Sequence, residues 1–259
     1  MRQTMIRKKL DIKLKDPILI EGLPGLGLVG KIVIRYLIRQ LRAKLFARLY
    51  SPFFPYHVLV NKKGSAQLLK SDFYYWKNNA PKGNDLILLT GDTQAQTIEG
   101  QYDVTSKILE FAEDHDVKTI LTIGGYSTPG QGVEPRVLGV ATSPELLKRL
   151  VDAGVKISPA GNPIVGTAGL LVGLAKFKHL EAACLLGETV GYMPDPKAAK
   201  NVLRALLLIL NIKLDLSDLD REIEKAKEVL KRLRTVEKKL KSYEEAYQKA
   251  EKEKMTYIS

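Results

Sequence analysis

Short apolar runs alternate, along most of the chain, with segments in which apolar residues recur every three or four positions. The clearest runs are DPILIEG (16–22), NDLILLTGD (84–92), VKTILTIGG (117–125) and EAACLLGE (181–188), and glycine accompanies the end of each. Continuous apolar runs of this kind are typical of buried strands, whereas the longer spacing is typical of amphipathic helices. Strands that alternate with crossover helices predict an α/β fold with a doubly wound, mostly parallel sheet.

The helices predicted between these strands carry recognisable start and stop signals. Ser143 is expected to cap a helix that ends near Gly154, and Asp195 precedes Pro196 at another helix start. Further short strands are expected in HVLVNKKGSAQLLKSDFYYW (57–76), around a Lys-Lys-Gly turn, and in VLGVAT (137–142). The predicted helices are LVGKIVIRYLIRQL (28–41), TIEGQYDVTSKILEFAEDH (97–115), SPELLKRLVDAG (143–154), IVGTAGLLVGLAKFKH (164–179) and DPKAAKNVLRALLLIL (195–210).

The pattern changes near residue 213, which divides the chain into an α/β domain, 1–212, and a helical tail, 213–259. The tail has a narrow apolar repeat, typical of a coiled-coil seam, and no glycine or proline. We expect it to contact a partner helix, a second copy or another domain; the alternative is a solvated helix on its own domain. The predicted interaction residues of the repeat are Leu216, Leu219, Ile223, Leu230, Leu233 and Leu240.

The glycine-rich turn after the first apolar run nearly satisfies two phosphate-binding motifs. Gly25, Gly27 and Gly30 match G-x-G-x-x-G, and Gly25, Gly30 and Lys31 match G-x-x-x-x-G-K. The second motif requires Ser or Thr after the lysine, where this chain has Ile32. The first requires an acidic residue about 20 positions later. Residues 43–56 contain no acidic side chain, so a strand, glycine turn and helix are predicted rather than a nucleotide site.

Glycine-rich loops follow four of the predicted strands, at 22–27, 91–96, 124–132 and 187–196. The carboxyl ends of parallel strands share one edge of a sheet, so these loops are expected to lie together. They would bring together Asp92, Gln94, Gln96, Tyr126, Glu188 and Asp195. As an enzyme or sensor, the chain would bind a nucleoside or phosphorylated metabolite there, with Lys31 nearby and Glu188 and Asp195 as acid and base. As structural residues, the glycines would form turns and the carboxylates would cap helices.

Composition and charge narrow the function further. The chain has 41 Lys and Arg against 29 Asp and Glu, and residues 1–48 hold twelve basic and three acidic side chains. Without interleaved aromatic residues, this excess favours an ordinary soluble surface over a nucleic-acid site. A lone cysteine, Cys184, and three scattered histidines predict no disulfide, metal site or catalytic set. No signal peptide and no apolar run of about 18 residues is visible, so a cytoplasmic protein without membrane contact is expected.

The motifs, taken in order, resemble those of the proteasome assembly chaperone family in its archaeal branch. The resemblance covers residues 10–212 and rests on GLPGLGLVG (22–30), GDTQAQTIEGQYD (91–103), TIGGY (122–126), GNPIVGTAGLLVGLA (161–175) and GETVGYMPDPKAA (187–199). It implies a sheet of the nucleoside-phosphorylase-like type without an established catalytic set or cofactor. It also implies a homo-oligomeric assembly factor, scaffold or ATP-independent regulator, with another copy, a paralogue, or the 20S proteasome or its α subunits as partner.

The C-terminus departs from one feature of these relatives. Some of them dock on the proteasome through a terminal hydrophobic-Tyr-X tripeptide, whose ring enters a pocket while the carboxylate pairs with a lysine. This chain ends in MTYIS, so Ile258 occupies the penultimate position and Tyr257 is displaced by one residue. The displacement argues against activation through the tail, although Tyr257 remains a candidate interaction residue.

Overall fold

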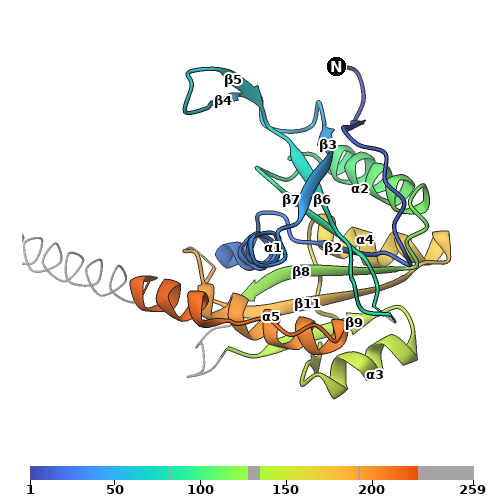
Figure 1. Cartoon of the computed structure of the whole chain (residues 1–259), viewed down its shortest axis with the longest axis vertical. Helices are drawn as coiled ribbons and strands as arrows, with labels where there is room; N and C mark the ends of the chain where they lie inside the picture. Colours follow the sequence, from blue (N-terminus) through green and yellow to red (C-terminus); the bar gives the residue numbers. More distant parts are fainter. Residues whose placement is uncertain (82, 128–134, 192, 227–259) are drawn as a thin grey trace, which may run out of the picture. The chain divides into compact units, whose positions relative to one another are not determined.

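Nine strands of the computed structural model join one mixed sheet, in the order β1-β3-β6-β7-β2-β8-β11-β9-β10 (Figure 1). The structure describes residues 1–81, 83–127, 135–191 and 193–226. The chain divides into two units, Met1–Asp215 and Leu216–Ser259, which are described separately. In the first unit the elements are β1 (Met5–Lys8), β2 (Ile18–Glu21), α1 (Val29–Gln40), β3 (Lys44–Tyr50), β4 (Val58–Val60), β5 (Ala66–Leu68), β6 (Ser71–Trp76), β7 (Leu86–Gly91), α2 (Ile98–Glu113), β8 (Thr119–Ser127), β9 (Val137–Ala141), α3 (Pro144–Asp152), β10 (Lys156–Ile157), α4 (Thr167–Ala175), β11 (Glu181–Thr189) and α5 (Pro196–Leu210).

The sheet is parallel in its centre and antiparallel towards its edges. Strands β7, β2, β8 and β11 run parallel to one another, as predicted. On one side β6, β3 and β1 continue the sheet with antiparallel pairs, and on the other β9 is antiparallel to β11. Strands β1 and β3 were not predicted, because basic residues interrupt their apolar pattern. The sheet is therefore mixed, and less parallel than the sequence suggested.

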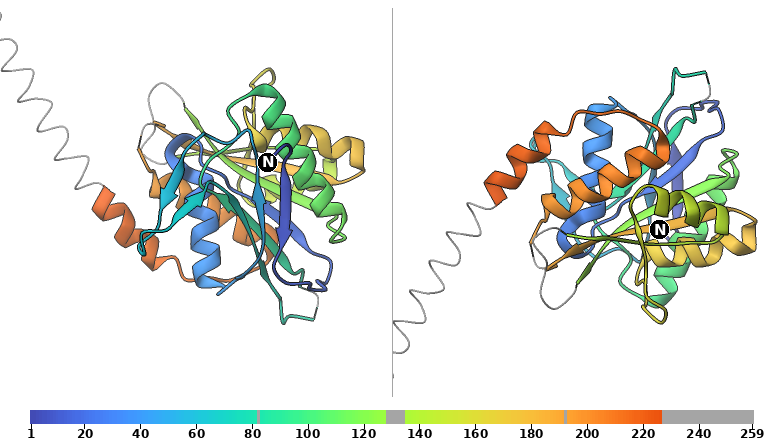
Figure 2. Two further views of the ribbon diagram at one scale, coloured as in Figure 1. Left: turned by 90° about the horizontal axis from the view of Figure 1, so that it is seen from above. Right: turned by 90° about the horizontal axis from the view of Figure 1, so that it is seen from below.

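Helices cover both faces of the sheet, which makes three layers. Helices α2 and α4 pack together on one face, while α1 and α5 pack together on the other, with α3 beside α5 (Figure 2). Two of these helices begin at the capping residues expected from the sequence. Ser143 Oγ accepts a bond from Leu146 N–H at 3.2 Å, and an Asp195 carboxylate oxygen accepts one from Ala198 N–H at 2.9 Å.

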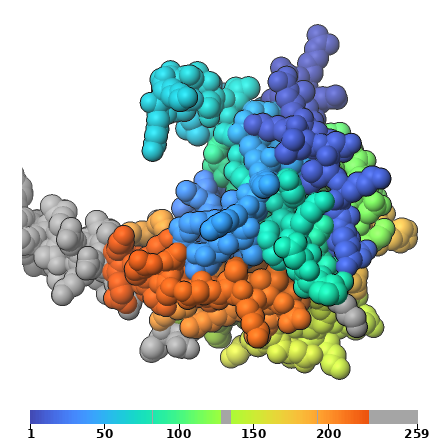
Figure 3. All heavy atoms as spheres, in the orientation of Figure 1, coloured from blue at the N-terminus to red at the C-terminus, as the bar shows by residue number. Residues whose placement is uncertain are grey.

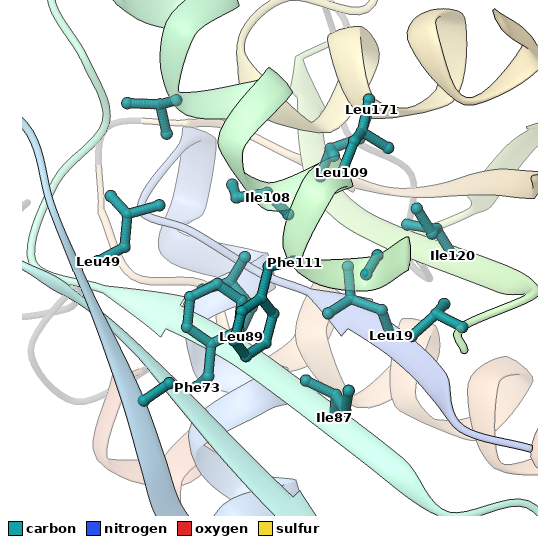
Figure 4. Close-up of a cluster of buried hydrophobic side chains, with 14 of the residues drawn as sticks. Leu19, Leu49, Phe73, Ile87, Leu89, Ile108, Leu109, Phe111, Ile120 and Leu171 are labelled. Atoms are coloured by element: carbon teal, nitrogen blue, oxygen red, sulfur yellow. The ribbon is translucent and has the colours of Figure 1, made fainter. Parts of the chain in front are cut away.

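One large cluster of the core lies between the sheet and the α2/α4 layer. Phe111 of α2 packs against Phe73 of β6, with ring centroids 4.3 Å apart (Figure 4). The apolar residues of the central strands complete this cluster, among them Leu19, Ile87, Leu89 and Ile120. Within the ranges that the structure describes, no helix is both long enough and apolar enough to cross a membrane.

The second unit is helical over residues 217–226 in the part that is described. Leu216 is half-buried, and Leu219 and Ile223 are buried. The two buried residues are four positions apart, so they share one face of the helix, as the apolar repeat predicted. The other four predicted interaction residues, Leu230, Leu233, Leu240 and Tyr257, lie outside the described residues.

Candidate functional site

The loops after β2, β7 and β11 meet at one edge of the sheet, which we call the glycine-loop edge, whereas residues 128–134 after β8 lie outside the described residues. Hydrogen bonds join these loops directly: Gly27 N–H donates to Gly191 O at 3.1 Å, and Asp195 N–H donates to Gly27 O at 2.8 Å. Gln94 Nε2 donates to Pro24 O at 2.8 Å. The predicted gathering is therefore confirmed for these three loops. What the site can bind depends on their side chains and amides.

The glycines of the turn are required by close packing of the backbone. Gly27 has φ of 59°, and a Cβ there would overlap the Thr189 side chain. A Cβ on Gly30 would overlap the carbonyl oxygen of Ile123, and one on Gly22 would overlap the carbonyl of Gly30. Only glycine permits such approaches at low cost. The motif that resembles a phosphate loop thus brings α1 against β8.

Two amides of this turn are already bonded inside the protein. Gly27 N–H donates to Gly191 O, and Leu28 N–H donates to Gly25 O at 2.9 Å. These two N–H groups, which would face a phosphate in a phosphate-binding loop, therefore already have acceptors. Lys31 is half-buried, and burial lowers the pKa of its amine, an effect that nearby Asp92 partly offsets. This geometry gives no support to a nucleotide site at Gly25, Gly27, Gly30 and Lys31.

Glu188 is buried at the end of β11 and engaged by one arginine. Arg136 Nη2 lies 2.9 Å from Glu188 Oε1, and Arg136 Nε and backbone N–H donate to Oε2 at 3.1 and 3.0 Å. A forked contact of this kind is strong and fixes the orientation of the carboxylate. Because Asp195 caps α5, both carboxylates considered as acid and base have roles in the fold.

Sequence reasoning did not single out Glu21, the buried carboxyl at the end of β2. Its Oε1 accepts a bond from Leu23 N–H at 2.8 Å, whereas Oε2 has no hydrogen-bond partner among the described residues. Burial raises the pKa of Glu21 to about 8, with the Leu23 bond acting in the opposite direction. The signal in the sequence was an acid that ends an otherwise apolar run, ILIE, directly before a glycine.

Two residues lie beside Glu21 in the sheet register, Thr122 on β8 and then Cys184 on β11. Burial raises the pKa of the Cys184 thiol to about 12, so the thiol stays protonated at neutral pH. Across the described residues, no group of three or more His, Cys, Asp and Glu side chains is placed to hold a metal ion.

Gln94 and Gln101 act as cross-links between loops. Gln94 Oε1 accepts a bond from Thr167 N–H at 3.0 Å, while its amide nitrogen holds Pro24. Gln101 Nε2 donates to Ala95 O at 2.6 Å, and its Oε1 accepts a bond from Thr167 Oγ1 at 3.0 Å. Gln94, in the loop after β7, and Gln101 of α2 therefore hold the start of α4 at this edge.

Apolar side chains are exposed around these cross-links. Leu26 is 48% exposed, Ile98 76% and Val165 86%. Gln94 and Gln101 bond to Pro24, Ala95 and Thr167. Leu26, Ile98 and Val165 each lie within three residues of one of these bonded residues. Bonded polar groups inside and apolar groups outside are typical of a protein-interaction surface rather than of a small-molecule site.

Comparison with known proteins agrees with the fold and the order of the motifs. The model of the PAC2 family matches residues 19–234. PbaB of Pyrococcus furiosus, an archaeal proteasome activator, is 40% identical, with a TM-score of 0.87 over 90% of this chain and 100% of that chain. PbaA of the same organism, an archaeal homolog of proteasome-assembly chaperone, is 28% identical, with a TM-score of 0.73 over 98% and 99%.

A further relative extends the match by sequence alone. The uncharacterized protein MJ1210 of Methanocaldococcus jannaschii is 31% identical over 241 residues, which are 93% of this chain and 92% of that protein. The family model, the solved structures and this relative all cover most of the α/β domain. As its resemblance to the proteasome assembly chaperones predicted, the chain belongs to the PAC2 family.

Proposed function

We propose that this protein is a non-enzymatic, homo-oligomeric factor that binds the 20S proteasome or its α subunits. It would act as an assembly factor, a scaffold or an ATP-independent regulator, with a paralogue as a possible second partner. The observation that carries the proposal is the 40% identity to an archaeal proteasome activator across the whole of that chain. We also assign the sheet to the nucleoside-phosphorylase-like type.

The glycine-loop edge supports a role in protein contact. Its amides and carboxylates are engaged in holding loops and helices, while Leu26, Ile98 and Val165 face outward. Apolar side chains at a fixed edge lose unfavourable contact with water when a partner covers them.

The tail is proposed to mediate self-association. Replacing Leu230 and Leu233 together by Asp should lower the mass of the oligomer, because charge in an apolar seam loses its hydration without gaining a partner. Size-exclusion chromatography with light scattering measures this mass directly. Each buried leucine contributes about 1.5–3 kcal/mol, so two are enough to shift an association equilibrium.

The matched control is Lys231→Ser with Thr235→Asp, which gives the same net change of charge off the apolar repeat. This control should keep the mass of the wild-type protein. Thermal melts of both variants should show an intact α/β domain. A lower melting temperature with an unchanged mass would contradict the proposed role, because the repeat would then stabilise its own chain.

A further inference from the structure

The hairpin β4–β5 is set apart from the nine-stranded sheet, and we call residues 56–68 the arm. Its strands pair only with each other among the described residues. Its strand residues are exposed throughout, and Val60 is 71% exposed. Figure 3 shows the arm standing clear of the rest of the unit. A lone two-stranded hairpin is marginally stable in water, so an arm of this kind gains stability when something covers it.

A cavity of about 430 Å³ lies between the root of the arm and the face of strands β1 and β3. Met5 is in register with Tyr50, and Arg7 with Arg48, so these four side chains share one face of the sheet. Leu68 of the arm contributes to the opposite wall. The other face of β3 packs into the core, which leaves this face to form a groove.

The charge of this groove has one sign. Arg7, Arg48 and Lys70 line it, and no acidic side chain does. Arg48 Nε lies 2.9 Å from Asp72 Oδ1, and Lys70 Nζ lies 3.6 Å from Asp92 Oδ2. Two of these three cations are therefore already paired with a carboxylate. Arg7 is exposed and forms no ion pair with any described residue. The arm continues the same sign, since residues 56–68 hold two lysines and no acid.

We propose that this groove binds an extended segment of a protein partner in which carboxylates alternate with apolar side chains. A carboxylate would pair with Arg7, and apolar side chains would cover Met5, Tyr50 and Leu68. An extended segment also supplies backbone groups for the unpaired edge of the hairpin, which a lipid surface cannot do. A second copy is a poorer occupant, because the whole chain has a net charge of +12.

Binding of a fluorescein-labelled peptide of alternating Glu and Leu to the full chain tests the proposal. Fluorescence anisotropy should show saturable binding, and a peptide with Gln in place of Glu should bind about tenfold more weakly. Arg7→Glu should weaken binding of the acidic peptide by about tenfold or more. Leu68→Ser, at an exposed position, should weaken it without affecting the fold.

Lys8→Glu is the matched control, because this exposed neighbour points to the opposite side of β1 and changes the charge equally. It should alter binding by less than about twofold. Equal losses for Arg7→Glu and Lys8→Glu would overturn the proposal in favour of unspecific attraction. Tighter binding to phosphatidylserine vesicles than to the peptide would overturn it, as would a change of oligomer mass in Arg7→Glu alone. The assay contains no proteasome, so its outcome is independent of the proposed function.

Discussion

Replacing Gly30 by alanine is expected to destabilise the α/β domain by about 3 kcal/mol or more. The added methyl group would overlap the carbonyl oxygen of Ile123, and the backbone of Gly22 lies on the same side. Both obstacles are backbone atoms of the central strands or their turn, which cannot move as a flexible side chain does. Helix α1 would have to move away from β8. Urea denaturation, followed by circular dichroism, measures the change in the free energy of unfolding.

Gly173→Ala is the matched control for this substitution. Gly173 also lies within a helix, α4, but a Cβ there meets no atom within 4 Å. Alanine should therefore stabilise the protein by about 0.5–1 kcal/mol, the usual difference between the two residues inside a helix. Equal effects at both positions would contradict the close packing at Gly30 and would reopen the role of this turn in binding a ligand.

Glu21→Gln is expected to remove a large part of the pH dependence of stability. The pKa of Glu21 rises from 4.5 to about 8 on folding, so the folded protein holds a proton that the unfolded chain releases in this range. The free energy of unfolding should therefore fall as the pH rises from 4.5 to about 8. The slope is at most about 1.4 kcal/mol per pH unit. A neutral amide cannot ionise, so the variant should be the more stable protein on the alkaline side.

Thermal or urea unfolding at about pH 5 and about pH 9 measures this difference. Glu99→Gln, at an exposed position at the start of α2, is the matched control and should keep the pH dependence of the wild type. Parallel curves for the wild type and Glu21→Gln would show that Glu21 stays ionised in the folded protein. An ionised Glu21 would require a hydrogen-bond donor for Oε2, which has none among the described residues.

The centre of the fold could be predicted from sequence because its strands are continuously apolar and two of its helices, α3 and α5, begin at clear capping residues. The run ILIE, the Ser143 and Asp195 caps and the glycine turn all signal their structure locally. The antiparallel edges could not be predicted in the same way. Strand β1, MIRK, depends on pairing with β3, a contact between residues far apart in the sequence.

The candidate site was predictable in its position and not in its chemistry. The carboxyl ends of parallel strands lie at one edge of a sheet, so the position of the loops could be predicted. The pairing of Glu188 with Arg136 joins residues that are 52 positions apart, and no local pattern indicates it. Gly25, Gly27, Gly30 and Lys31 matched phosphate motifs because the same short turn suits both a phosphate and close helix packing. The bonds made by the Gly27 and Leu28 amides and the close approaches of Gly22 and Gly30 favour packing over phosphate binding.

Sedimentation velocity of the labelled full chain, mixed with purified 20S proteasome or its free α subunits from the same organism, tests the proposed function most directly. A protein that acts through the proteasome should sediment with the particle or with the α subunits at micromolar concentration, without added nucleotide. The unlabelled chain, in excess, should displace the labelled one from a specific complex. If the chain sediments alone in both mixtures, as a stable folded protein, the proposal that it acts on the proteasome is wrong.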